Sequence, residues 1–472
     1  MRDSVTESIE QPLARLRRRA PVSCAPETTV AQALQTMREL TIGSIIVIGP
    51  DRVPLGILTL RDVVDRVVLE PGALDAPIAR VMTPRPVTLL QDTTAYAAAL
   101  AMIRHGVRHI VLVEDGGRLA GIVSERDLFG LHSSGVRHLS EAIRGAEDLP
   151  AIEQFGRDIG DLAGQMLGQG VAAGPLTAFI ASLIDLLTQR IVETEFRTVT
   201  ARCCWILMGS EGRSEQTLYT DQDNGVIFAL EPGENVESVR AAIVPVARRI
   251  NQSLDRAGYR LCPGDIMAGN PQWTLSLDEW RSKFERWIDS GSPEALLHGA
   301  IFFDLRPLHG DLALARDLRR GLMQHAPRNP RFLHQMAENA LKNRPPLGMF
   351  RRFAVDQDGM INLKLNGATP FVDVARIFSL AHGIDEVNTE RRLRAAVPAL
   401  GVPQGEAEAW IAAYYHIQGL RLRRQAECLR QGLAPDNRVA ADSLNEFDQR
   451  TLASALRQAR AIQARVAADY RV

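Results

Sequence analysis

Residues 208–225 read MGSEGRSEQTLYTDQDNG, and this stretch decides the fold of the central part of the chain. The apolar run 203–208 before it predicts a strand, and the run 224–230 predicts a second strand. Between the strands, Gly209 and Ser210 open a short helical segment, EGRSEQTL. Backbone amides and a hydroxyl at the start of a helix favour a bound anion, such as the phosphate tail of a nucleotide.

Two aspartates, Asp221 and Asp223, lie where the second strand begins. Side chains alternate along an extended segment, so we expect both carboxylates on one face. Two such carboxylates repel each other unless a cation lies between them, and oxygen ligands favour Mg²⁺ or Mn²⁺. A hairpin turn at DNG would account for Asn224 and Gly225. It would not account for the Gly-Ser pair or for Arg213, whose charge suits phosphates.

The composition sets the class of protein. A length of 472 residues indicates about two to four domains, and 46% apolar with 24% charged residues is typical of a globular protein. A net charge of -1 gives no electrostatic case for nucleic acid or an anionic membrane as the main partner. The basic N-terminus lacks the apolar core of a secretory signal, and no run is long enough to span a bilayer. With five Cys and no C-x-x-C spacing, we expect a reduced, cytoplasmic protein.

An internal repeat occupies the N-terminal part of the chain. Residues 21–64 and 86–129 align without a gap, and the aligned pairs include Thr28 with Thr93, Met37 with Met102, Gly56 with Gly121, and Asp62 with Asp127. Each copy predicts a short strand, an amphipathic helix, two strands around a turn and a second helix. One copy alone cannot bury both faces of its small sheet, so we expect the two copies to pack as a pair.

The repeat resembles the CBS domain over roughly residues 20–135, through the motifs GILTLRD and GIVSERD. The resemblance implies that Thr59 and Ser124 contact phosphate and that Asp62 and Asp127 hold the ribose hydroxyls of an adenine nucleotide. It also implies a homodimer, because CBS pairs commonly stack face to face. The same [ST]-x-x-[DE] spacing is that of a helix capping box, which needs no ligand.

The central motif resembles the polymerase-beta-like nucleotidyltransferases, in which GS and a short helix precede [ST]-D-x-D on the next strand. It is similar to the PII-protein uridylyltransferase group, and closer to the DUF294 nucleotidyltransferases, which place CBS pairs ahead of this domain. The later segments CPGDIMAGNPQWTLSLDEWRSKFERWI and FFDLRPLHGD also resemble DUF294 members, so the likeness runs from about residue 21 to the C-terminus.

The resemblance implies transfer of a nucleoside monophosphate from a nucleoside triphosphate, UTP or ATP, to a hydroxyl. Asp221 and Asp223 would hold two metal ions. Gly209 and Ser210 would hold the β- and γ-phosphates, and Arg213 would assist the departing pyrophosphate.

A third carboxylate often activates the attacking hydroxyl in such sites. Asp265, expected on a later strand, is the first candidate. Asp304 is the second, although it can equally form a structural ion pair with Arg306. If neither serves, the site works with two acids or is impaired.

The fold class is therefore multidomain α/β plus α. We expect an N-terminal extension over 1–20, tandem CBS domains over 21–135 (21–76 and 77–135), a helical linker over 136–200, a nucleotidyltransferase domain over 201–311 and a helical substrate-binding domain over 312–472. In the last domain, Lys364 stands in an apolar, strand-like run and either lines the nucleotide site or lies on an exposed face.

The function that follows is a CBS-regulated nucleotidyltransferase in signal transduction, and we expect the acceptor hydroxyl to belong to a protein. The alternative is a non-catalytic, nucleotide-sensing regulator with a vestigial transferase domain. The presence of both Asp221 and Asp223 favours the enzyme, and the unassigned third carboxylate favours the regulator. Transfer to a small molecule is a third possibility that the sequence does not separate from the first.

Overall fold

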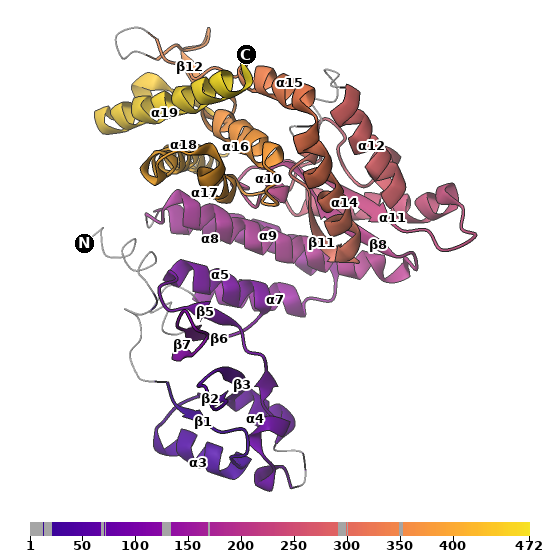
Figure 1. Cartoon of the computed structure of the whole chain (residues 1–472), viewed down its shortest axis with the longest axis vertical. Helices are drawn as coiled ribbons and strands as arrows, with labels where there is room; N and C mark the ends of the chain where they lie inside the picture. The colour runs from indigo at the N-terminus through magenta and orange to yellow at the C-terminus, as the bar shows by residue number, and fades with distance from the viewer. Residues whose placement is uncertain are drawn as a thin grey trace. The chain divides into compact units, whose positions relative to one another are not determined.

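A computed structural model of the chain describes residues 21–67, 72–124, 134–168, 170–290, 301–348 and 353–472, together with Leu13, Glu70 and Gly299. The chain forms two compact units, Met1–His138 and Leu139–Val472. Each unit has its own sheets and its own apolar core. Figure 1 labels their elements.

The first unit contains two small sheets, ordered β1-β2-β3-β4 and β5-β6-β7. The strands are β1 (Ser23–Cys24), β2 (Ser44–Ile48), β3 (Pro54–Thr59), β4 (Thr83–Pro84), β5 (Thr88–Leu90), β6 (His109–Val113) and β7 (Leu119–Ser124). The helices are α3 (Val30–Glu39), α4 (Leu60–Arg66) and α5 (Ala95–His105), with 3-10 turns η1 (Ala73–Asp75) and η2 (Ile78–Arg80).

The strand register confirms the internal repeat. In the first copy Ser44 pairs with Thr59 and Val47 with Gly56, and the equivalent pairs in the second copy are His109 with Ser124 and Leu112 with Gly121. Both hairpins also shift register at the same place, after Val47 and after Leu112. The two copies therefore share side-chain alternation as well as strand order.

The predicted ligand residues of the first copy form a capping box at the start of α4. The backbone N–H and the hydroxyl of Thr59 both donate to Asp62 Oδ2, at 2.9 and 2.7 Å, and Asp62 N–H returns a bond to Thr59 Oγ1 at 3.4 Å. Thr83 donates to the other oxygen of Asp62 at 3.0 Å. The carboxylate thus has a structural use in the free protein. Ser124 ends β7, and Asp127 lies outside the described residues.

The second unit is built on one mixed sheet, ordered β10-β9-β8-β11. Its strands are β8 (Cys203–Leu207), β9 (Asn224–Phe228), β10 (Thr274–Ser276) and β11 (Arg306–Gly310). β9 lies antiparallel to β8 and parallel to β10, and β11 lies antiparallel to β8. The two central strands are those predicted on either side of the Gly-Ser and Asp-x-Asp motif.

Helices cover both faces of this sheet. They are α7 (Ser134–Gly145), α8 (Leu149–Gly168), α9 (Ala173–Glu195), α10 (Gly209–Gly212), α11 (Val236–Arg256), α12 (Leu277–Ser290), α14 (Leu312–His325) and α15 (Pro330–Ala340), with the 3-10 turns η3 (Phe196–Thr198), η4 (Pro271–Trp273) and η5 (Ala326–Arg328). The C-terminal elements are β12 (Met360–Asn362), the π-helix η7 (Leu363–Ala368), α16 (Thr369–Ala381), α17 (Thr389–Leu400), α18 (Gln404–Arg430), β13 (Arg438–Ala440), η8 (Ala441–Ser443) and α19 (Glu446–Tyr470).

Alternation along β8 divides its side chains between two cores. Trp205 and Leu207 face a core shared with α8, α9 and α11, whereas Cys204 and Ile206 face a core shared with α12, α14 and the C-terminal helices. The helical linker of the sequence analysis therefore packs as part of the second unit, where α8 and α9 lie side by side (Figure 1). The prediction that no run is long enough to span a bilayer is wrong for α9, which is long and apolar enough by composition. Its apolar side chains form this core, and 72% of that apolar window is buried.

Two local predictions differ from the structure. Residues 261–269 form no strand, and Asp265 has a left-handed backbone (φ 53), because the Pro-Gly pair just before it favours a turn. Lys364 is not on a strand: β12 ends at Asn362, whose side chain accepts the backbone N–H of Lys364 at 3.1 Å and caps η7.

One buried carboxylate joins the sheet to the C-terminal helices. Asp304 is fully buried and accepts hydrogen bonds from Arg213 (2.5 Å), Arg376 (2.9 and 2.7 Å) and Arg392 (2.6 Å). The charges of these arginines hold the pKa of Asp304 far below its usual range, against the opposing effect of burial. Arg306, the partner considered from the sequence, binds Asp185 instead (2.6 Å). Asp304 is thus a structural ion-pair residue.

We expect Asp304→Asn to lower the free energy of unfolding by about 3–5 kcal/mol, because the substitution leaves buried arginines without their shared counter-charge. Since the folded pKa of Asp304 is depressed, its contribution is fully present above the unfolded pKa of about 3.9 and is lost only as the pH falls further. The decrease in unfolding free energy caused by Asp304→Asn should therefore be the same at pH 5 and at pH 7, as measured by urea unfolding.

Asp436→Asn is the matched control, because Asp436 pairs with Arg424 at a half-buried site that water can reach. It should change stability by about 1 kcal/mol or less. Equal effects of the two substitutions would contradict a dominant role for Asp304.

Candidate active site

The Gly-Ser turn and the second aspartate meet directly. The backbone N–H of Met208 donates to the carbonyl of Asp223 at 2.8 Å. Gly209 has a left-handed backbone (φ 54), and a Cβ added there would lie 2.3 Å from Asp223 Oδ2. Only glycine combines that conformation with so close an approach. The backbone of the turn therefore lies against the carboxylate of Asp223.

The second contact between the two halves of the motif joins two hydroxyls. Ser210 Oγ lies 3.2 Å from Thr220 Oγ1, and Thr220 also donates to the carbonyl of Asp221 at 3.3 Å. Ser210, Asp221 and Asp223 each keep part of their surface exposed. A ligand can therefore reach a hydroxyl, a glycine turn and two acids at one place.

Buried amides fix the strand that carries the acids. Gln222 is fully buried and donates to the carbonyls of Asn251 (3.0 Å) and Tyr259 (2.7 Å). Asn251 in turn donates to the side chains of Gln222 (2.8 Å) and Asn224 (2.9 Å). Because Gln222 and Asn224 alternate with the two aspartates, this network orients both carboxylates toward the opposite face.

Desolvation governs the charge of Asp223. Burial raises its pKa to about 6, while the Cys262 thiol, Lys364 and Arg213 oppose that rise and the neighbouring Asp221 adds to it. Cys262 Sγ, at 3.5 Å from Oδ1, is a weak donor. The carboxylate thus keeps lone pairs for a cation, and its oxygen donors suit Mg²⁺ or Mn²⁺.

Two acids, Asp221 and Asp223, are partly exposed at this place. Within the described part of the chain, no group of three or more His, Cys, Asp or Glu side chains is arranged to hold a metal ion. The side chain of Asp265 is exposed and accepts a hydrogen bond from Asn270 at 3.0 Å. Asp265 therefore does not join the acid pair as a further metal ligand, and Asp304 is committed to its arginines.

The contacts of Arg213 also differ from those expected of its predicted role, which was to assist the departing pyrophosphate. Its Nε donates to Glu215 (2.9 Å) and its Nη1 to Asp304 (2.5 Å), and only 12% of its side chain is exposed. The guanidinium thus faces two interior carboxylates, and a contact with pyrophosphate would have to compete with both. The phosphate role of Arg213 is replaced here by a structural one.

Glu211 is a buried acid of the site that the sequence analysis missed. Its Oε2 accepts the backbone N–H of Asp223 at 3.3 Å. Burial and the nearby charge of Asp223 raise its pKa well above the usual value. The sequence signal that could have identified Glu211 was its place inside GSEGR, between Gly209 and Gly212.

Lys364 brings a cation to the site from the C-terminal helices. It is solvent-exposed, yet desolvation and the charge of Arg421 lower its pKa, whereas Asp221 and Asp223 raise it. The structure thus places Lys364 within electrostatic reach of the acid pair.

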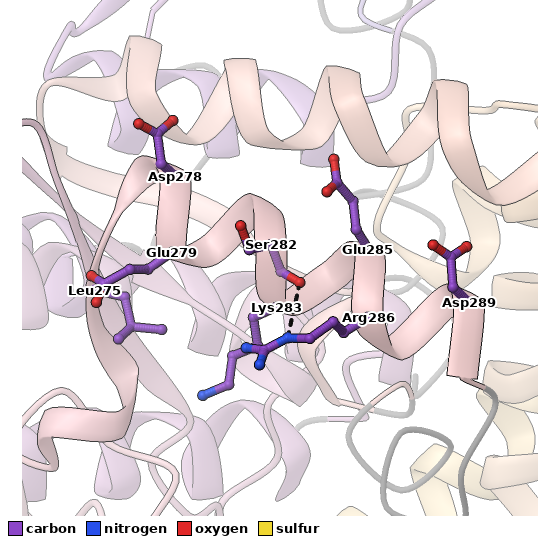
Figure 2. Close-up of a pocket in the computed structure, with 8 residues that line it drawn as sticks. All are labelled: Leu275, Asp278, Glu279, Ser282, Lys283, Glu285, Arg286 and Asp289. Atoms are coloured by element: carbon purple, nitrogen blue, oxygen red, sulfur yellow. Dashed lines mark hydrogen bonds between the residues drawn. The ribbon is translucent and has the colours of Figure 1, made fainter.

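A separate groove runs along α12 (Figure 2). Its lining residues are Leu275, Asp278, Glu279, Ser282, Lys283, Glu285, Arg286 and Asp289, and it encloses about 630 Å³. Lys283 Nζ lies 4.3 Å from the ring centre of Trp273 and donates to the carbonyl of Gln272 at 3.1 Å. None of the motif residues lines this groove, so it is distinct from the acid pair.

Comparison with known families agrees with this geometry. The model "Putative nucleotidyltransferase DUF294" matches residues 157–294, and "Putative nucleotidyltransferase substrate binding domain" matches 330–470. The CBS domain matches 13–69 and 78–133. The two DUF294 models together span more than half of the chain. The chain belongs to the DUF294 family and carries a CBS pair.

Individual relatives match shorter stretches. An uncharacterized protein of Methanopyrus kandleri is 32% identical over 27% of this chain and 65% of its own length. An uncharacterized 17.7 kDa protein of Acidianus ambivalens is 35% identical over 22% of this chain and 62% of its own length. The chain therefore spans just under two thirds of these relatives. A CBS domain protein of Pyrobaculum aerophilum, solved with AMP, is 28% identical with a TM-score of 0.23, covering 25% of this chain and 88% of that one.

The DUF294 match begins within α8, ahead of the first strand of the sheet. This agrees with the packing of α8 and α9 on the sheet, and it places the start of the nucleotidyltransferase region earlier than the predicted residue 201. The DUF294 substrate-binding match contains η7 and α18, and hence Lys364 and Arg421.

We expect Gly209→Ala to weaken Mg²⁺-dependent nucleotide binding, because the new methyl group would displace the Asp223 carboxylate. Binding should weaken by at least about tenfold in isothermal titration calorimetry with MgATP and MgUTP. Gly401→Ala is the control: Gly401 has a similar backbone (φ 61), and a Cβ there meets no atom within 4 Å. It should lose only about 1 kcal/mol of stability and keep nucleotide binding. Wild-type affinity in Gly209→Ala would contradict the site.

Proposed function

We propose that this DUF294 protein transfers a nucleoside monophosphate from a nucleoside triphosphate to a hydroxyl group of an acceptor. The observation that carries the proposal is the contact of the Gly209 turn with the Asp223 carboxylate. It brings backbone amides and a hydroxyl, which suit phosphates, against an acid pair, which suits a divalent cation.

Each residue has a distinct task in this proposal. Asp221 and Asp223 hold Mg²⁺ or Mn²⁺, which supplies charge neutralisation for the phosphates and a lowered pKa for the attacking hydroxyl. Ser210 and the turn at Gly209 orient the triphosphate. The amide network of Gln222 keeps both carboxylates on one side, so little reorganisation is needed when substrate binds.

The finer points follow from the resemblance to PII-protein uridylyltransferases. The nucleotide is UTP or ATP, and the acceptor hydroxyl belongs to a protein. An adenine nucleotide at the CBS pair regulates the reaction, provided that it binds the active and inactive states with different affinities. The CBS ligand residues that the resemblance implies are Thr59, Asp62, Ser124 and Asp127, and a nucleotide at the first pair would compete with the capping box for the carboxylate of Asp62. The CBS pair also forms the homodimer.

A second candidate function is a regulator that binds nucleotide without transferring it. The observation in its favour is the two-acid site, without a third metal-ligating carboxylate among the described residues. In that case the Gly209 turn and the acid pair would retain nucleotide affinity, and the helical domain would act through partners.

A transfer assay separates the two functions. Purified protein and host lysate are incubated with each of four α-labelled nucleoside triphosphates and Mg²⁺ or Mn²⁺, and label transfer and pyrophosphate release are followed. We expect transfer that Asp223→Asn lowers by at least about a thousandfold, because the variant loses the metal-binding charge.

Asp265→Asn is the matched control, since it removes an acid from a neighbouring loop whose side chain bonds to Asn270. It should retain transfer within about threefold of wild type. Equal loss in both variants would reassign Asp265 to the chemistry. Nucleotide binding without transfer from any triphosphate would favour the regulator.

A further inference from the structure

Arg421 is a buried cation without an acidic partner. It lies on α18 and is only 7% exposed. Its Nε donates to Asn437 Oδ1 at 2.9 Å, and its Nη1 donates to Gln418 Oε1. Both partners are neutral amides. Across the described ranges, no carboxylate lies within ion-pair distance of Arg421, and Nη2 has no hydrogen-bond acceptor.

Other deeply buried arginines of the same unit are paired. Arg376 and Arg392 bind Asp304, and Arg319 binds Asp385. Arg213 binds Asp304 and Glu215, and Arg376 also binds Asp373. The charges around Asp304 are therefore balanced without Arg421. Burying a charge without a counter-charge is costly, so Arg421 requires a different explanation from the others.

Arg421 lies beside Lys364. Asn437, which holds the Nε of Arg421, also accepts the backbone N–H of Leu363 at 2.9 Å, and Leu363 is followed directly by Lys364. η7 packs closely on α18, where a Cβ added to Gly367 would lie 3.0 Å from Ile417 Cγ2. The charge of Arg421 is one of the causes that lower the pKa of Lys364. Two cations from the C-terminal domain thus lie together.

Hydrogen bonds through Gln418 and Tyr414 connect Arg421 to Glu215, on the segment that leads from the Gly209 turn to the acid pair. Asp221 and Asp223 both act on the pKa of Lys364, and Lys364 acts on that of Asp223. Lys364 forms no ion pair at contact distance with any described residue. Once a divalent cation neutralises the two aspartates, Lys364 and Arg421 are left without a counter-charge. Such an arrangement suits a polyanion that binds beside the metal.

Buried hydrogen bonds hold Arg421 in place relative to the motif. Gln418, the acceptor of Nη1, donates to Tyr414 OH at 2.8 Å, and Tyr414 donates to Glu215 at 2.9 Å. Glu215 also accepts from Arg213, Asn388 and Thr389, so its oxygens are engaged with other donors and it reaches Arg421 only through Tyr414 and Gln418. A chain of hydrogen bonds thus connects Arg421 to Glu215 in the GSEGRSE segment and fixes the position of Arg421.

We propose that Arg421, together with Lys364, binds the triphosphate of the nucleotide, and that the bound phosphates supply the counter-charge that Arg421 lacks. Arg421 thereby takes the phosphate role that the sequence suggested for Arg213. The inference rests on the proposed nucleotide site, but it requires only that a polyphosphate binds there, not that a nucleotide is transferred.

The test compares the full-length wild type with Arg421→Gln and Lys364→Gln, using inorganic tripolyphosphate as the probe, with and without Mg²⁺. Calorimetry gives the affinity, and thermal unfolding gives the stability. We expect Arg421→Gln to weaken tripolyphosphate binding by at least about tenfold. Its unfolding temperature without ligand should be equal to or above that of wild type, because an unpaired buried charge has been removed. Lys364→Gln should weaken binding without changing stability, since Lys364 is exposed.

The control is Arg423→Gln, two residues along the same helix, where Arg423 pairs with Asp448 at the surface. It should bind tripolyphosphate as wild type does. A marked loss of stability in ligand-free Arg421→Gln would show a structural role and overturn the proposal. Wild-type affinity in Arg421→Gln, or no binding by wild type itself, would also overturn it. Failure of the transfer assay alone would leave it standing, because tripolyphosphate carries no nucleotide to transfer.

Discussion

The ion-pair cluster at Asp304 is the constraint on which the second unit depends. One fully buried carboxylate binds three guanidinium groups that come from the motif turn, from α16 and from α17. Each of these arginines would be expensive to bury alone. Arg213 and Arg376 also pair with Glu215 and Asp373, which lie close to them in sequence, but both still share Asp304 with Arg392. The motif turn and the C-terminal helices are therefore expected to assemble together, because they share the charge of this one carboxylate.

This requirement explains how one site draws on two sequence families. In the proposed site, the DUF294 region supplies the turn and the acids, and the substrate-binding region supplies Lys364 and Arg421. Glu215 strengthens the same junction by accepting hydrogen bonds from Asn388 and Thr389 at the start of α17. A carboxylate at the N-terminus of a helix is also favoured by the helix dipole. The geometry of the site is thus set by the junction rather than by either region alone.

The sequence was most informative where function depends on local spacing. Gly209 and Asp223 are brought together by the length of the segment between two strands, and the alternation of side chains predicts that Asp221 and Asp223 share a face. The repeat at the N-terminus likewise predicted equal hairpins, because register follows from the pattern of apolar residues. These features need no knowledge of distant partners.

The sequence did not predict which residues form ion pairs with each other when they lie far apart along the chain. Nothing near Asp304 in the sequence distinguishes Arg306, which binds Asp185, from Arg376 and Arg392, which bind Asp304. The buried ion pair of Arg213 with Asp304 depends on that same choice of partners. By contrast, the turn at Asp265 had a local signal in the Pro-Gly pair before it. The cap at Asn362 also had a local signal, because asparagine is a preferred N-cap residue.

The packing of α8 and α9 on the sheet determines which fragments of the chain can stand alone. The apolar side chains of these helices and of β8 bury one another, so a piece that begins at residue 201 would present half of that core to water. It would be expected to aggregate, whatever the state of its acids. The smallest fragment that keeps the acid pair in its native surroundings begins near residue 139 and extends through α19. Leu139 is the first residue of this core among those that the structure describes, so a cut ahead of residue 139 leaves the described core whole.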